Sequence, residues 1–143
     1  MYINNDKFVY LACFFNPPDL FFGLAHVDRV ELERPILNPH VTLVYKPKII
    51  DTTLFGEKIL VNVNGYGYNQ YNEGLRVSMF AQNPALQELI SKIEIPHITL
   101  SVSNGGKAVN TRSLDFSPIV SFDIIGLFGG YTYDGQIVYY EQK

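Results

Sequence analysis

The amino-acid sequence predicts an α+β domain built mainly of antiparallel sheet. Several short segments carry the aromatic and β-branched residues typical of strands, and turn residues separate them. Only one segment combines the apolar spacing and the capping residues of a helix. Strands and helices therefore do not alternate as they do around a parallel sheet, and 143 residues are enough to bury one core. We expect a single domain over residues 1–143.

Two strands are predicted in the first third of the chain. Residues 7–15 read KFVYLACFF and end at the turn signal Asn-Pro-Pro of 16–18. Residues 40–45 read HVTLVY and lie between two prolines.

A hairpin followed by a helix is predicted in the middle of the chain. Residues 58–68 alternate apolar with polar side chains, which indicates a half-buried strand, and 75–80 should pair with it. The glycines, asparagines and tyrosines of GYGYNQYNEG, residues 65–74, predict a flexible loop able to close over a ligand. The helix is expected over 83–93, because Asn83 is a good N-cap and Pro84 suits the first helical position. Apolar residues then recur at helical spacing.

The chain is expected to return to sheet after this helix. Residues 97–102 predict a strand, and 104–116 predict a loop with a helical turn. A closing hairpin is expected from 119–128 and 136–140, around the turn YDGQ.

A five-residue phrase occurs twice, as PHVTL at 39–43 and PHITL at 96–100. It holds two of the three histidines of the chain. Because side chains alternate along a strand, His40 and Thr42 share one face, and so do His97 and Thr99. If the two strands meet in a shared cleft, two imidazoles and two hydroxyls converge there.

Paired imidazoles and hydroxyls suit the cleavage of a phosphodiester. Imidazole titrates near neutrality, so one ring can accept a proton while the other donates one. The hydroxyls can hydrogen-bond the non-bridging oxygens as negative charge develops. No metal or other cofactor is required for these proton transfers.

Plainer interpretations apply to the same residues. A single His-x-Thr in a strand is usually an ordinary histidine beside a good β-former, and the repetition is what favours a paired site. A zinc site is disfavoured, because two histidines are too few ligands. Cys13 lies in an apolar run and is expected to be a buried structural thiol. His26 has no Thr two residues later and is expected to be structural.

Charge and composition limit the partners. A formal charge of −3 argues against a protein that grips long nucleic acid, but it permits a small anionic ligand. No membrane span is expected. No signal peptide is expected either, because the apolar run near the start is only about eight residues long, lacks a small-residue cleavage site and runs directly into Asn-Pro-Pro. With one cysteine, the chain is expected in a reducing cytoplasm. The oligomeric state is left open.

The two motifs, His40-Val41-Thr42-Leu43 and His97-Ile98-Thr99-Leu100, resemble those of the 2H phosphoesterase superfamily. The resemblance implies a bilobal, pseudo-twofold (LigT-like) fold with a central cleft. It also implies that His40 and His97 are the acid/base pair and that Thr42 and Thr99 bind phosphate, without a metal.

Within that superfamily, the stretches NPHVTLVYKP and PHITLSVSNGGKAVN are most similar to phage anti-CBASS phosphodiesterases. This resemblance implies cleavage of 3′–5′ linkages in the cyclic oligonucleotide messengers of bacterial immunity, in the host cytoplasm if the source is a phage. Two alternatives remain open. One is a 2H enzyme acting on RNA or on 2′,3′-cyclic nucleotides, and the other is a nucleotide-binding sponge without turnover.

Tyrosines are the candidates for base recognition, because bases stack on aromatic rings. Tyr10 and Tyr131 are the preferred substrate-binding residues. Weaker candidates are the loop tyrosines Tyr66, Tyr68 and Tyr71, together with Tyr133; for each, an ordinary half-buried or surface tyrosine is the favoured interpretation. Lys46 and Lys107 follow the two motifs and are expected to be solvated.

Overall fold

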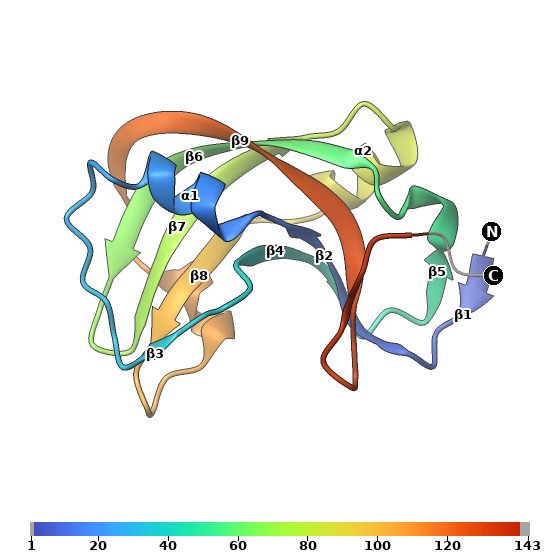
Figure 1. Cartoon of the computed structure of the whole chain (residues 1–143), viewed down its shortest axis with the longest axis horizontal. Helices are drawn as coiled ribbons and strands as arrows, with labels where there is room; N and C mark the ends of the chain where they lie inside the picture. Colours follow the sequence, from blue (N-terminus) through green and yellow to red (C-terminus); the bar gives the residue numbers. More distant parts are fainter. Residues whose placement is uncertain (1, 141–143) are drawn as a thin grey trace.

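The computed structural model describes residues 2–140 and confirms an α+β chain with mainly antiparallel sheet (Figure 1). An eight-stranded sheet dominates the fold, and β1 pairs with β5 in a small separate ribbon. The strands are β1 Tyr2–Asn4, β2 Phe8–Phe14, β3 Arg34–Pro35, β4 His40–Tyr45, β5 Ile49–Asp51, β6 Lys58–Tyr68, β7 Asn72–Phe80, β8 His97–Val102, β9 Ser117–Thr132 and β10 Ile137–Val138. The helices are α1 Pro17–Gly23 and α2 Pro84–Ser91, with short 3₁₀ helices η1 Thr52–Leu54 and η2 Ala108–Ser113.

The large sheet curves until two distant strands meet. Its order is β3-β8-β7-β6-β9-β2-β4, with β10 paired to β9. Four strands separate β4 from β8 along this order, yet β4 and β8 contact each other near the centre of the molecule (Figure 1). The curvature therefore brings the two PHxTL segments together.

One face of the sheet is sealed by an apolar core. Along β6 the alternate residues Ile59, Val61 and Val63 are fully buried, as the period-two pattern predicts. Val41 and Ile98, which follow the two motif histidines, are buried in the same core cluster. The motif histidines and threonines therefore project from the opposite face.

The predicted helix after β7 is confirmed as α2. The side chain of Asn83 accepts hydrogen bonds from the backbone N–H groups of Ala85 and Leu86, at 2.9 and 3.3 Å. These bonds satisfy N–H groups that lack partners within the helix. Leu86 and Ile90, one turn apart, are buried against the sheet.

The helix α1 was not predicted, because Asn-Pro-Pro at 16–18 was interpreted as a turn alone. Asn16 instead occupies the N-cap, and the prolines stand at the first helical positions, where no N–H is needed. Leu20 is fully buried, whereas the neighbouring Phe22 is 86% exposed. The exposed aromatic residues obscured the helical spacing of the buried ones.

The prediction of a flexible loop between β6 and β7 is wrong. Both strands continue through this segment, and only residues 69–71 form the turn. The side chain of Asn69 closes the turn by accepting the N–H groups of Tyr71 and Asn72, each at 2.8 Å. Tyr66 is buried within β6 rather than free to close over a ligand.

The remaining elements follow the prediction closely. The strands at 40–45 and 97–102 have the expected bounds, and the loop after β8 contains η2. β9 and β10 form the closing hairpin. Cys13 is buried, as expected. Among the helices of residues 2–140, none is long and apolar enough to cross a membrane.

Candidate functional site

The two motif histidines are held in the same way. The Nδ1 atom of His40 lies 2.8 Å from the carbonyl oxygen of Asn38, and that of His97 lies 2.9 Å from the carbonyl oxygen of Ile95. A carbonyl oxygen only accepts hydrogen bonds, so each Nδ1 carries the hydrogen. In the neutral ring, Nε2 therefore keeps its lone pair for another partner.

Burial and charge lower the pKa of both histidines below the ordinary value of 6.5. For His40 the main cause is burial; the charge of His97 lowers the pKa further, and the hydrogen bond to Asn38 opposes the shift. For His97 the main cause is again burial, and the charge of Arg112 adds to it. The elements that carry these residues contact each other: β4 with His40 contacts β8 with His97, and β8 contacts η2 with Arg112.

The two motif threonines have different surroundings. Thr42 faces Ala12 across the sheet, and Thr99 faces Gly74, so each stands beside a residue with little or no side chain. Thr42 is exposed. The hydroxyl of Thr99 instead lies 2.8 Å from Thr111 Oγ1 and 3.2 Å from the carbonyl oxygen of Ala108, both in η2. The motif repeats in sequence, but the Thr42 hydroxyl is exposed to solvent, whereas the Thr99 hydroxyl is hydrogen-bonded to η2.

An aromatic stack includes His40. The ring of Tyr10 lies 4.8 Å from that of His40 and 5.1 Å from that of Tyr131, with interplanar angles of 18° and 13°. Phe14, which faces His40 across the β2–β4 pairing, lies 5.7 Å from the imidazole. Burial, followed by the charge of Tyr131, raises the pKa of Tyr10 to about 12, so its phenol stays protonated.

Tyr10 and Tyr131, the two tyrosines predicted to bind substrate, therefore lie beside His40. Phe14 was not singled out from the sequence. It lies four residues after Tyr10 on the same strand, so strand alternation indicated that it shares the face of Tyr10.

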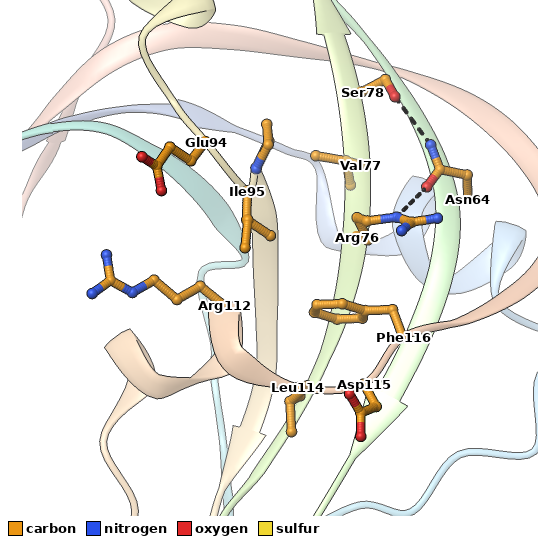
Figure 2. Close-up of a pocket in the computed structure, with 11 residues that line it drawn as sticks. Asn64, Arg76, Val77, Ser78, Glu94, Ile95, Arg112, Leu114, Asp115 and Phe116 are labelled. Atoms are coloured by element: carbon orange, nitrogen blue, oxygen red, sulfur yellow. Dashed lines mark hydrogen bonds between the residues drawn. The ribbon is translucent and has the colours of Figure 1, made fainter.

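A pocket of about 540 Å³ opens beside the second motif (Figure 2). Ile95 and Pro96, immediately before His97, line it together with Arg76, which faces His97 across the β7–β8 pairing. Arg112 of η2 also lines it. Sequence analysis missed both arginines. Strand alternation in the predicted strand 75–80 could have indicated which face Arg76 occupies. The position of Arg112 depends instead on the path of the loop after β8.

A second pocket, of about 380 Å³, lies beside the first motif. Asn38 and Pro39, which precede His40, line it together with Phe14 and Tyr139. The residues that line it carry no charge, whereas two arginines and two acidic residues line the first pocket. The two motifs are thus flanked by pockets at equivalent positions but of different chemistry.

The weaker candidates from the sequence have other surroundings. His26 is exposed, with Nε2 3.1 Å from the carbonyl oxygen of Val120. Tyr66 donates its hydroxyl hydrogen to buried Glu73 at 2.7 Å. Tyr68, Tyr71 and Tyr133 are exposed, and so are Lys46 and Lys107.

Comparisons with known protein families, with curated proteins and with solved structures found no match for this chain.

Proposed function

We propose that this chain is a phosphodiesterase of the 2H type, which cleaves a phosphodiester by paired-histidine acid/base catalysis without a metal. The observation that carries the proposal is that His40 and His97 are held by equivalent hydrogen bonds. Each ring donates Nδ1–H to the carbonyl oxygen two residues earlier, and the strands that bear them contact each other. Within the described part of the chain, residues 2–140, neither Nε2 atom has a hydrogen-bond partner, so both imidazoles are available to one substrate.

The order of elements supports a bilobal, pseudo-twofold arrangement. A strand, a helix and a motif strand occur as β2–α1–β4, with the two-residue β3 before β4, and again as β7–α2–β8. Each motif strand pairs antiparallel with the first strand of its set. β9 flanks β2, β6 flanks β7, and β6 pairs with β9 between the two sets. A twofold relation between the sets would place His40 and His97 at equivalent positions.

The chemistry follows from the protonation states of the two rings. One neutral imidazole removes the proton from a ribose 2′-hydroxyl, whose oxygen attacks phosphorus and forms a 2′,3′-cyclic phosphate. The other, protonated imidazole gives its proton to the departing 5′-oxygen. The exposed hydroxyl of Thr42 is available to hydrogen-bond a non-bridging oxygen. The Thr99 hydroxyl binds a non-bridging oxygen in the same way once it rotates away from its hydrogen-bond partners in η2.

The substrate class that we propose is the cyclic oligonucleotide messengers of bacterial immunity, so that the protein counteracts CBASS defence. The stack of Tyr10 and Tyr131 beside His40 supports a nucleotide ligand, since aromatic rings accept bases without regard to sequence. The formal charge of −3 is compatible with a small anion and unfavourable for long RNA.

One assay tests this function and separates it from its rivals. Purified protein is incubated, with EDTA present, with cyclic di- and trinucleotides, a short RNA and a 2′,3′-cyclic mononucleotide, and the products are separated by chromatography. We expect turnover of the cyclic oligonucleotides. Preference for RNA or for the cyclic mononucleotide would favour the other 2H activity. Tight binding of unchanged ligand would identify a sponge, and activity abolished by EDTA would contradict the metal-free mechanism.

A further inference from the structure

Both faces of the Tyr10 ring are covered by other rings. The strand that carries Tyr10, β2, lies between β4 and β9 in the sheet. His40 of β4 stacks on Tyr10 at 4.8 Å, and Tyr131 of β9 stacks on it at 5.1 Å from the other side. Of the two tyrosines, only Tyr131 therefore has a ring face outside the stack. A substrate with two bases needs a second site for one of them.

The pocket beside His40 is separated from the imidazole by an aromatic ring. Phe14 faces His40 on β4 and Leu127 on β9, and its ring lies 5.7 Å from the imidazole. Ile125, two residues from Leu127 on β9, lies on the same face of the sheet. Phe14, Leu127 and Ile125 all line the pocket. A group bound there lies beside a ring that contacts the imidazole.

The segment after β10 adds a second aromatic ring to this pocket. Tyr139 lines it and packs edge-to-face against Phe14, with ring centroids 5.8 Å apart. Gly129 permits this packing, because a Cβ atom there would collide with the carbonyl oxygen of Val138 and lie 3.1 Å from the Tyr139 ring. Tyr139 is 36% exposed, so part of its ring is open to a ligand.

The lining of this pocket suits an uncharged planar ring rather than a phosphate. Within residues 2–140 no charged residue lines it, so a phosphate would have no counter-charge. Asn16 and Asn38 line it, and in the same part of the chain neither side-chain amide has a hydrogen-bond partner. An amide both donates and accepts, as the edge of a base does. The volume of about 380 Å³ is that of a small-ligand site.

We propose that this pocket binds a nucleobase of the substrate. The ring of the base lies against Phe14 and Tyr139, as bases do on aromatic side chains. Its edge meets the side-chain amides of Asn16 and Asn38. The inference rests on the proposed function and narrows it. The preferred substrates are phosphodiesters of nucleosides, and the enzyme discriminates among bases at this position.

A thermodynamic cycle between protein and ligand tests the pocket. The ligand is a 2′-deoxy dinucleotide, which lacks the attacking hydroxyl and is not cleaved. It carries two adenines or lacks either one, and its affinity is measured by calorimetry. We expect the loss of one particular adenine to weaken binding to the wild type at least about fivefold, the effect of losing a stacked base. Tyr139→Ala should reduce the contribution of that adenine at least about threefold and leave the contribution of the other unchanged.

Two variants control this cycle. Tyr139→Phe keeps the ring, and Tyr68→Ala makes the same truncation at an exposed tyrosine outside the lining, so both should respond like the wild type. If Tyr139→Ala changes affinity equally whether or not either adenine is present, the pocket holds no base and the proposal is overturned. An active enzyme without the coupling would refute the pocket alone, whereas coupling in an inactive protein would refute catalysis alone.

The edge of the base is tested at Asn16. Its side chain makes no capping bond, so Asn16→Ala removes no hydrogen bond from the described part of the protein. The same uncleaved dinucleotides are compared with each of the four bases at either position. We expect the ratio of affinities between the best and the worst base at one position to fall at least about twofold in this variant, the effect of one hydrogen bond. Unchanged ratios at both positions would overturn the reading of the base edge by Asn16.

Discussion

The rings of Tyr10 and His40 lie 4.8 Å apart with an interplanar angle of 18°, so the phenol ring covers one face of the imidazole. Tyr131 covers the other face of Tyr10 at 5.1 Å. This stack fixes the plane of His40 while Asn38 fixes its Nδ1 atom. An imidazole whose tautomer and plane are both set is prepared for proton transfer, and the surrounding rings also keep water away from it.

Removing the Tyr10 ring should disturb His40. We expect Tyr10→Leu to raise the pKa of His40 toward 6.5, because burial is the main cause of its lowering. The pKa is measured by NMR titration of the imidazole protons. Tyr10→Phe keeps the ring and is the matched control, with a pKa close to that of the wild type. An unchanged pKa in Tyr10→Leu would show that Tyr10 does not shield His40.

The pH dependence of activity should be displaced to the acid side. The general base must be neutral and the general acid protonated, so kcat/KM is highest between the two apparent pKa values of the free enzyme. Because both histidines have a pKa below 6.5, the maximum should lie below pH 6.5 and activity should fall as the pH rises further. A pH–rate profile with its maximum at or above pH 7 would contradict this assignment.

Each motif histidine should be required for turnover. His40→Ala and His97→Ala are expected to lower kcat by at least about a hundredfold, the contribution usual for general acid–base catalysis. Circular dichroism and thermal unfolding should still show a folded protein. The third histidine supplies the control, because His26 is exposed and its ring nitrogen bonds the backbone carbonyl of Val120, so His26→Ala should keep full activity. A fully active single variant at either motif would remove that residue from the mechanism.

The repeated motif allowed the strands of the candidate site and the shared face of each His and Thr to be predicted, since strand alternation follows from sequence alone. His40 and His97 occupy strands with the predicted bounds, and Tyr10 lies beside His40 as its parity indicated. The features of the candidate site that depend on tertiary contacts could not be predicted from the sequence. Arg112 is carried by η2, which packs on β8, and no local sequence pattern encodes that packing. The packing of η2 on β8 also hydrogen-bonds the Thr99 hydroxyl, whereas the Thr42 hydroxyl is exposed. Two nearly identical motifs give no sign of this difference.

A buried carboxylate joins β7 to β6, to β8 and to the segment between α1 and β3, and it should matter for stability. Glu73 is 0% exposed and accepts hydrogen bonds from Arg29 at 2.9 Å, Tyr66 at 2.7 Å and Ser101 at 2.7 Å. Glu73→Ala removes the acceptor and leaves three donors without it. We expect the free energy of unfolding in urea to fall by about 3 kcal/mol or more, as when one partner of a buried ion pair is removed.

The exposed Glu57 provides a comparison for this variant, because Glu57→Ala makes the same chemical change at the surface. Its free energy of unfolding should stay within about 0.5 kcal/mol of the wild type. Equal effects of the two variants would mean that the network around Glu73 contributes little to stability.

The difference between the two motif threonines gives the last prediction. Thr42→Val should lower kcat without lowering stability, because the hydroxyl of Thr42 is exposed and is available to the substrate. Thr99→Val should lower both, since its hydroxyl also holds η2 through Thr111 and the carbonyl oxygen of Ala108; the loss of such a hydrogen bond costs about 1 kcal/mol of unfolding free energy. Thr111→Val should reproduce the stability loss while Thr99 remains present, because Thr111 is fully buried and also accepts from Asn72. Steady-state kinetics and urea unfolding of the three variants separate the two effects. If Thr42→Val and Thr99→Val lose stability equally, the asymmetry of the two hydroxyls has no energetic consequence, and an undiminished kcat in both would exclude them from phosphate binding.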